Sequence, residues 1–254
     1  MVLSWMLLCS LLPQPAPPFW VLPFAMTPAT LSAHVADGAP RVLYQREDWL
    51  PRLDELRRTF GRNKEIPPRY ELETLLALSH FPALKDTRIR FVTRSRAPIS
   101  SRPFVWTLLR GRKSLRVYRI GIDESDRFGN SPALLKNMSF NARVGALGHE
   151  IAHTDYYETK RWYQFIAIGA SFVSRKFHKK FERDTDQRTI EAGLGHQLWL
   201  WAREIRGGRV TDNPNSWLDR YYYAPSVIAE QMARLAAYQR LPTPQEALED
   251  EAVR

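Results

Sequence analysis

The chain has 254 residues, of which 44% are apolar, enough for one domain with a sizeable core and a possible extension. The formal net charge is +10, which is compatible with an acidic partner such as nucleic acid, although only Arg175 to Lys180 form a basic run. Cys9 is the only cysteine, which excludes an intramolecular disulfide and a metal site built from thiolates.

Residues 1–40 form an apolar, proline-rich leader. Residues 1–36 contain no Asp, Glu, Lys or Arg, but they lack a basic start, a clear cleavage site and the roughly 20 uninterrupted apolar residues of a membrane span. Three interpretations remain open: an atypical export signal, a disordered leader, or a true translation start at Met26. We expect the folded domain to cover residues 41–254 and the protein to be cytoplasmic rather than exported.

The first part of the domain is predicted to contain two helices and three strands. Leu50, Leu53, Leu56 and Phe60 follow helical spacing up to Gly61, and a second, leucine-rich helix is expected afterwards. The second helix and the strands are expected at Tyr70–Leu78, Thr87–Val92, Phe104–Leu109 and Leu115–Ile122. Ile89 and Phe91 alternate with arginines, and Gly111 lies in the hairpin connection that would join the last two strands.

The most informative motif is His149-Glu150-Ile151-Ala152-His153. Two histidines four residues apart lie on one face of a helix, one turn from each other, so both imidazoles can reach one metal ion with Glu150 beside it. Asn141 is the predicted N-cap of this helix. Its apolar face carries Val144, Leu147 and Ile151, and the small Gly148 and Ala152 allow close packing.

A second motif, Glu182-Arg183-Asp184-Thr185-Asp186, follows on another helix. Glu182 and Asp186 are one turn apart, so Glu182 can complete the metal site while Asp186 orients a ligating histidine. Asp155 and Glu158 remain alternative ligands. Asp184 is disfavoured because it lies on the opposite helix face.

The remaining segments are assigned from apolar spacing. We expect Trp162–Val173 to form a buried core helix, since a dozen apolar residues are too few for a bilayer span. The helix that begins at Glu182 is expected to continue through Trp201, and a last helix to run from Pro225 to Tyr238. Among the other histidines, His178 is predicted at the surface, His34 and His80 as structural or solvated, and His196 is undecided.

These residues together are those that a hydrolytic zinc site needs. Catalytic zinc uses three protein ligands, here His149, His153 and Glu182, and lowers the pKa of the water at its fourth position to about 7. Glu150 would accept a proton from that water and pass it to the leaving amine. A further donor is needed for the oxyanion. The candidates are Tyr221, Tyr222, Tyr223 and His196, of which we select Tyr222.

The two motifs resemble those of the gluzincin metallopeptidases, in particular the group of the membrane heat-shock protease and the CAAX prenyl endopeptidase. The resemblance covers about residues 139–195. It implies one Zn²⁺ held by His149, His153 and Glu182, with Glu150 as catalytic base and Asp186 outside the ligand sphere. Unlike those relatives, this chain shows no clear membrane helix, so a soluble gluzincin-like protein is expected.

We therefore predict a helix-rich α+β, zincin-like domain with a small antiparallel sheet beside the active-site helix, which hydrolyses peptide or protein substrates. In zinc peptidases a sheet edge beside this helix commonly receives the substrate backbone as an added strand. The alternative is a catalytically inactive zincin-fold protein whose basic surface holds an acidic partner such as nucleic acid.

Overall fold

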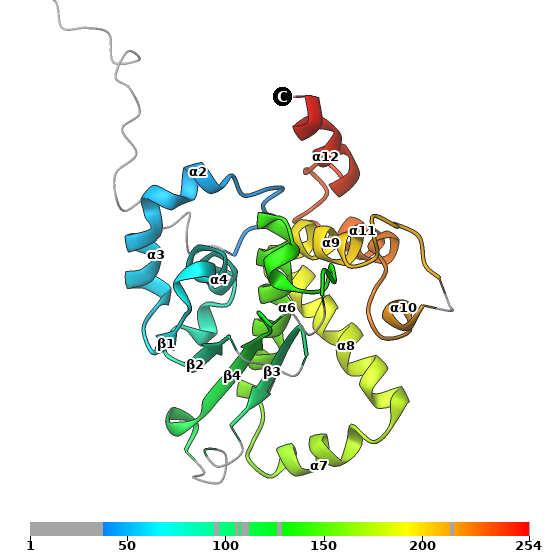
Figure 1. The fold of residues 1–254 in the computed structure, drawn as a ribbon. Helices are drawn as coiled ribbons and strands as arrows, with labels where there is room; N and C mark the ends of the chain where they lie inside the picture. Colours follow the sequence, from blue (N-terminus) through cyan, green and yellow to red (C-terminus); the bar gives the residue numbers. More distant parts are fainter. Residues whose placement is uncertain are drawn as a thin grey trace, which may run out of the picture. The chain divides into compact units, whose positions relative to one another are not determined.

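The structure is a computed structural model that describes residues 38–93, 97–104, 107, 112–125, 129–213 and 216–253. All of them belong to the unit Val35–Arg254, so the predicted leader and His34 lie outside the described residues apart from residues 38–40. Helices dominate this unit, with a small sheet beside the central helix (Figure 1). The predicted α+β fold class is confirmed.

The helices pack around α6, which carries the first motif. Their bounds are α2 (Arg46–Trp49), α3 (Leu53–Phe60), α4 (Glu71–Ser79), α6 (Phe140–Glu158), α7 (Gln164–Ser171), α8 (Arg175–Thr189), α9 (Gly195–Glu204), α10 (Trp217–Tyr221), α11 (Pro225–Ala233) and α12 (Pro244–Val253). Helices α4, α8 and α9 and strand β3 all contact α6. The first motif therefore lies at the centre of the main hydrophobic core.

The helices expected before the sheet are present, with small differences. The segment 46–60 is divided into α2, a 3₁₀ turn that contains Pro51, and α3. Leu56 and Phe60 are buried as predicted, whereas Leu50 is exposed on the turn. Helix α4 begins one residue later than expected. At the other end of the chain, α11 ends at Ala233 instead of Tyr238.

The sheet has the strand order β1-β2-β4-β3 and is mixed rather than antiparallel. Strand β2 is parallel to both β1 and β4, and only β3 and β4 are antiparallel. The strands are β1 (Lys64–Glu65), β2 (Arg88–Val92), β3 (Ile99–Pro103) and β4 (Val117–Ile122). The predicted antiparallel sheet is thus wrong for two of its three pairings. In β2, Ile89 and Phe91 are buried and Arg88 and Arg90 are exposed, as predicted.

The strand predicted at Phe104–Leu109 falls mostly on residues outside the described part of the chain, and the described strand nearest to it is β3, at residues 99–103. Pro103 closes this strand, since proline has no N–H to continue the ladder. Phe104, the first residue of the predicted strand, follows β3 outside any described strand and is 48% exposed. Residues 105, 106 and 108–111, including Gly111 of the expected hairpin, lie outside the described residues.

Ser139, not Asn141, caps the N-terminus of α6. The Ser139 hydroxyl accepts a hydrogen bond from the Ala142 backbone N–H. Asn141 instead bonds both backbone groups of Tyr44: its side-chain oxygen accepts from the Tyr44 N–H at 2.8 Å, and its amide donates to the Tyr44 carbonyl at 3.0 Å. Its polar side chain therefore fastens the beginning of the domain to the central helix.

Two glycines let α6 approach its neighbours closely. A Cβ at Gly145 would lie 2.1 Å from the Gln197 backbone oxygen of α9, and one at Gly148 would lie 2.5 Å from a Leu194 methyl carbon. The close packing predicted at Gly148 is confirmed. At Gly145 the neighbour is backbone, which cannot move aside as a flexible side chain would.

The helix predicted to run from Glu182 through Trp201 is interrupted. Helix α8 ends at Thr189, a π-helical turn covers Ile190–Leu194, and α9 begins at Gly195. Gly193 has φ +96°, and a Cβ there would meet the Gly38 carbonyl oxygen at 2.3 Å. The interruption lets the chain pass close to the beginning of the domain.

The expected buried helix at Trp162–Val173 is an exposed helix. Helix α7 contains no buried residue, and Ile166 and Val173 are 67% and 90% exposed. Phe165 and Ile168 pack against a small cluster around Tyr157 and Phe181, and the ring of Phe172 also contacts that of Phe181. Among the described residues, none of the helices combines the length and hydropathy that crossing a bilayer requires.

Candidate metal centre

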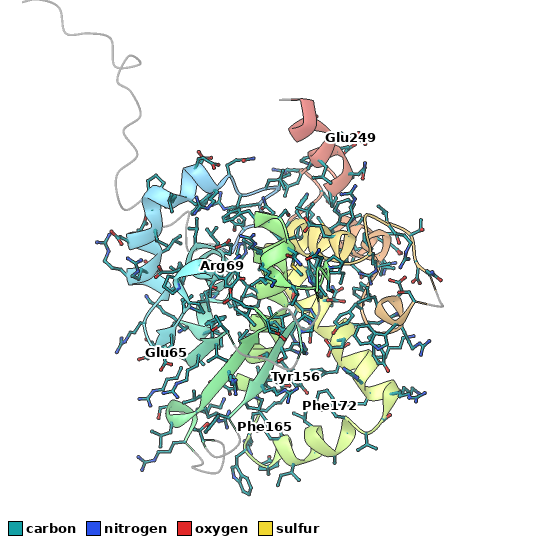
Figure 2. All side chains as sticks on the ribbon, in the orientation of Figure 1. Glu65, Arg69, Tyr156, Phe165, Phe172 and Glu249 are labelled. Carbon is teal, nitrogen blue, oxygen red and sulfur yellow. The ribbon has the colours of Figure 1, made fainter. Side chains whose placement is uncertain are left out.

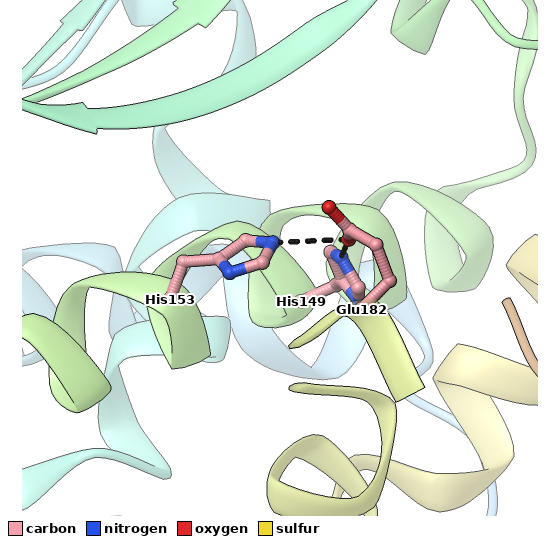
Figure 3. A group of neighbouring side chains, drawn as sticks. All are labelled: His149, His153 and Glu182. Carbon is pink, nitrogen blue, oxygen red and sulfur yellow. Dashed lines mark hydrogen bonds and ion pairs between the residues drawn. The ribbon is translucent and has the colours of Figure 1, made fainter. Parts of the chain in front are cut away.

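Helices α6 and α8 bring His149, His153 and Glu182 together. Their ligand atoms all lie within 4.8 Å of one another, and all three residues are buried (Figure 3). One oxygen of Glu182, Oε2, lies 3.2 Å from Nε2 of His149 and 3.3 Å from Nε2 of His153. Three donor atoms from two helices thus converge on one point, as the two motifs predict, and they can hold one metal ion.

Neighbouring groups fix the orientation of both imidazoles. Asp186 Oδ1 accepts a hydrogen bond from Nδ1–H of His149 at 2.9 Å. The Thr185 hydroxyl donates its proton to the Phe181 carbonyl, so it accepts from Nδ1–H of His153 at 3.1 Å. With Nδ1–H donated to these oxygens, Nε2 is in both rings the nitrogen that faces Glu182 and the one through which the ring can bind a metal ion once it carries no proton.

Asp186 is itself held in place. Its second oxygen, Oδ2, accepts a hydrogen bond from the Tyr223 backbone N–H at 2.8 Å. The carboxylate therefore links α6, α8 and the segment after α10. The predicted pairing of Asp186 with a motif histidine is present in the structure, with His149 as its partner.

His178 is a member of the site that the sequence prediction missed. It lies one turn before Glu182 on α8, and its Nε2 is 3.2 Å from Glu182 Oε1, the oxygen that faces away from the motif histidines. The two oxygens of Glu182 thus have separate partners, which favours binding of a metal ion through Oε2 alone. The i, i+4 spacing to Glu182 could have identified His178, but its place in a basic run suggested the surface.

The charges of the cluster favour a cation at its centre. Burial alone lowers the pKa of His149, but hydrogen bonds to Asp186 and Glu182 outweigh that effect and raise this pKa to about 10. Burial alone raises the pKa of Glu182, but the interactions with His153 and His149 lower it by more, so this pKa lies well below its usual range. Two carboxylates held this close stabilise positive charge between them, whether it is carried by an imidazolium or by a metal ion.

Glu150 lies beside the cluster and differs from it in its environment. Its side chain is buried, and within the described residues its Oε2 atom has no hydrogen-bond partner. Burial raises the pKa of Glu150, although His153 and His149 oppose the shift. A carboxylate with one unpaired oxygen at the wall of a cleft is positioned to exchange a proton with a bound molecule.

The cluster opens into a cleft of about 730 Å³. Glu150, His153 and Glu182 line its inner end, and strand β3, helix α7 and the region of Trp217 and Tyr222 form its walls. Most of these walls are apolar side chains. The polar groups are concentrated at the metal-ligand cluster and along β3, which is the edge strand of the sheet.

A buried ion pair holds the wall that contains Trp217 and Tyr222. Asp219 Oδ1 lies 2.5 Å from Nε of Arg206, and Asp219 Oδ2 lies 2.7 Å from Nη2 of Arg209. The backbone N–H of Asn213 also donates to Oδ2. Asp219 therefore connects the end of α9 to α10 across the intervening loop.

The four candidate oxyanion donors occupy different places. Tyr222 lines the cleft, with its ring 5.6 Å from that of His149. Tyr221 packs on His178 at 4.7 Å, and Tyr223 contributes its backbone N–H to Asp186. His196 is buried away from the cleft, where its Nε2 bonds the Pro242 carbonyl at 2.9 Å. Of the four, only Tyr222 lines the cleft.

The alternative ligands are not part of the cluster. Asp184 pairs with Lys180 at 2.5 Å on the outer side of α8, and Asp155 and Glu158 do not join the three ligating residues. His80 is structural, since its Nε2 lies 2.5 Å from the Tyr44 hydroxyl and its Nδ1 donates to the Ala192 carbonyl at 2.8 Å. It joins the beginning of the domain to the π-helical turn.

Two imidazoles, which become neutral when they bind a metal ion, and one carboxylate, each oriented by a neighbour, suit a divalent transition-metal ion with an open coordination position. The residues present therefore fit such an ion. Comparison of the chain with protein-family models, with curated proteins and with solved structures found no match.

Proposed function

We propose that this protein is a zinc-dependent peptidase of the gluzincin type, with a zincin-like catalytic core. The observation that carries the proposal is the convergence of His149, His153 and Glu182 at the inner end of a cleft, with the Glu150 carboxylate beside them. A structural role alone would not require a further buried carboxylate with an unpaired oxygen facing the same cleft.

Zinc held by these three residues would supply a water molecule of lowered pKa and a positive charge that polarises a carbonyl group. Glu150 accepts the proton of the attacking water and returns it to the leaving amine. Asp186 and Thr185 keep the imidazoles in the tautomer that leaves Nε2 unprotonated. Tyr222 is our choice for the group that donates to the carbonyl oxygen as negative charge develops there.

A peptide substrate is supported by the position of β3. This strand pairs with β4 on one side, is the last strand of the sheet on the other, and lines the cleft through Ser100, Ser101 and Arg102. An extended peptide can pair with such an edge through main-chain hydrogen bonds, which require no particular substrate sequence. The apolar cleft walls then contact alternate substrate side chains.

The metal content of the purified protein tests the proposal. We expect about one equivalent of zinc in the wild type by inductively coupled plasma mass spectrometry. His149→Ala and Glu182→Ala should each lose most of it, because two ligands rarely retain zinc through purification. Cleavage of an unfolded protein such as casein should be present in the wild type, stop with a chelator and return when zinc is added.

Asp184→Ala is the matched control for Glu182→Ala. It removes a carboxylate from the same helix two residues away, where the side chain faces solvent and Lys180. We expect its zinc content and cleavage rate to equal those of the wild type. A wild type without zinc after metal-replete purification, or a zinc-loaded wild type that cleaves no unfolded protein, would contradict the proposal and favour the binding-protein alternative.

The contact between His178 and Glu182 leads to a separate prediction. His178→Ala should weaken zinc binding by roughly tenfold, because Glu182 Oε1 loses the partner that holds the carboxylate in its orientation. Competition with a zinc-sensitive dye measures the affinity. Lys179→Ala, an exposed change on the same helix, is the control and should bind zinc as the wild type does. Equal affinities for all three proteins would show that the contact does not contribute.

A further inference from the structure

Helix α7 exposes an unusual amount of apolar surface. Trp162, Tyr163, Ile166 and Val173 are 47%, 49%, 67% and 90% exposed, and we refer to these four residues as the apolar ridge. They lie on α7 and at its two ends, and Trp162 and Ile166 also line the cleft, whereas Phe165 and Ile168 are partly buried. Phe165 lies near the beginning of α7, and Phe172 lies where the chain turns from α7 toward α8 (Figure 2). A ridge of this kind exposed to water indicates a partner surface.

Basic residues lie at both ends of the ridge. Between Glu158 and Glu182 the chain has six lysines and arginines and no acidic residue. Lys180 pairs with Asp184, and Lys160 lies over the Tyr156 ring. The four others are exposed, and we call them the basic flanks: Arg161, Arg175, Lys176 and Lys179.

We propose that the apolar ridge and its basic flanks dock this protein on the surface of an anionic lipid bilayer. The ridge enters the boundary between headgroups and acyl chains, and the flanks contact the lipid phosphates and carboxylates. Trp162 and Tyr163 precede the helix, and aromatic side chains of these two types favour the headgroup level of a bilayer.

The chemistry of the apolar ridge and its basic flanks favours a lipid bilayer over other partners. A nucleic acid would neutralise Arg175 and Lys176 but would leave Ile166 and Val173 in water. A bilayer covers both kinds of group at once. Helix α7 has eight residues and is about 12 Å long. It therefore lies at the surface, because the apolar layer of a bilayer is about 30 Å thick.

The position of α7 gives this docking a consequence for the candidate site. The helix forms one wall of the cleft through Phe165, Ile168 and Gly169, and Trp162 and Ile166 of the ridge also line the cleft while remaining about half or more exposed. Docking therefore brings the mouth of the cleft close to the bilayer surface. The proposal does not depend on the identity of the reaction, because it rests on the surface of α7.

Co-sedimentation of the full-length protein with lipid vesicles tests the proposal. We expect binding to phosphatidylcholine vesicles that contain 30% phosphatidylserine (an ordinary composition for such assays, roughly that of an anionic leaflet), and at least about tenfold weaker binding to pure phosphatidylcholine. The double variant Ile166→Ser/Val173→Ser should bind the anionic vesicles about tenfold more weakly, because it removes buried apolar contacts. The double variant Arg175→Gln/Lys176→Gln should also bind the anionic vesicles about tenfold more weakly, and its binding should depend much less on salt concentration.

Leu50→Ser/Arg58→Gln is the matched control. It removes one exposed apolar and one exposed basic side chain from α3 and the turn before it, and it should bind vesicles as the wild type does. Every protein retains residues 1–37, so differences between variants report on α7. The proposal is overturned if the wild type does not bind anionic vesicles or if both α7 variants bind them as the wild type does. It is also overturned if the ridge variant abolishes self-association or DNA binding while vesicle binding is unchanged.

Discussion

Glu150→Gln is expected to retain about one equivalent of zinc and to cleave an unfolded protein at least about a hundredfold more slowly than the wild type. The amide has nearly the same shape as the carboxylate but cannot accept the proton of the attacking water. Metal binding should persist because the three ligating atoms belong to His149, His153 and Glu182. Steady-state cleavage of a fluorogenic peptide, with zinc measured on the same samples, provides both quantities.

Glu158→Gln is the control for this change. Glu158 lies two turns after Glu150 at the end of α6, is partly buried and does not belong to the cluster. It should keep the wild-type rate. If Glu150→Gln cleaved as fast as the wild type, the assignment of the base would be wrong even with zinc present. If the variant lost its zinc, its low rate would carry no information about the base.

Gly145→Ala should lower the melting temperature by about 4 °C or more, which corresponds to a loss of roughly 1–3 kcal/mol. The added Cβ would lie 2.1 Å from the Gln197 carbonyl oxygen, and because that oxygen is backbone and the Cβ is fixed to the backbone of α6, α6 and α9 must move apart. Alanine is intrinsically the better helix former by about 1 kcal/mol, so the predicted loss goes against propensity. Differential scanning calorimetry measures the change.

Gly169→Ala makes the same substitution in α7, where nothing lies within 4 Å of the new Cβ. Here only helix propensity remains, so the melting temperature should stay the same or rise slightly. A fall in melting temperature for Gly145→Ala together with an unchanged or higher one for Gly169→Ala would support the close approach of α6 and α9. A similar effect at both positions would mean that the separation of these helices in the structure is too small.

The sequence predicted the centre of the site better than its surroundings. Spacing places His149 and His153 on one helix face, and the second motif places Glu182 and Asp186 on another, so local periodicity was enough to bring these residues together. His178 obeys the same i, i+4 rule with Glu182. It was missed because the surrounding lysines and arginines are typical of a solvated face, and the sequence does not show which side of α8 meets the cleft.

The errors in the fold have non-local causes. The strand order of the sheet depends on which strand β3 pairs with. The alternation of apolar and polar residues within a five-residue strand does not show whether that strand lies at the edge of the sheet. The interruption at Ile190–Leu194 depends on the approach of Gly38 and His80 to the turn, more than 100 residues away in the chain. The apolar pattern of α7 indicated burial, but hydropathy alone does not distinguish a core helix from an exposed one.

The two walls of the cleft are held by different forces. The α7 wall rests on contacts of Phe165 and Ile168 with an aromatic cluster. The opposite wall depends on Asp219, whose pKa burial raises but Arg206 and Arg209 lower more strongly, to below its usual range. That ion pair persists at neutral pH and is lost only as acid protonates Asp219. Acid therefore loosens one wall, whereas detergents and apolar cosolvents loosen the other, so the width of the cleft responds to two independent properties of the solvent.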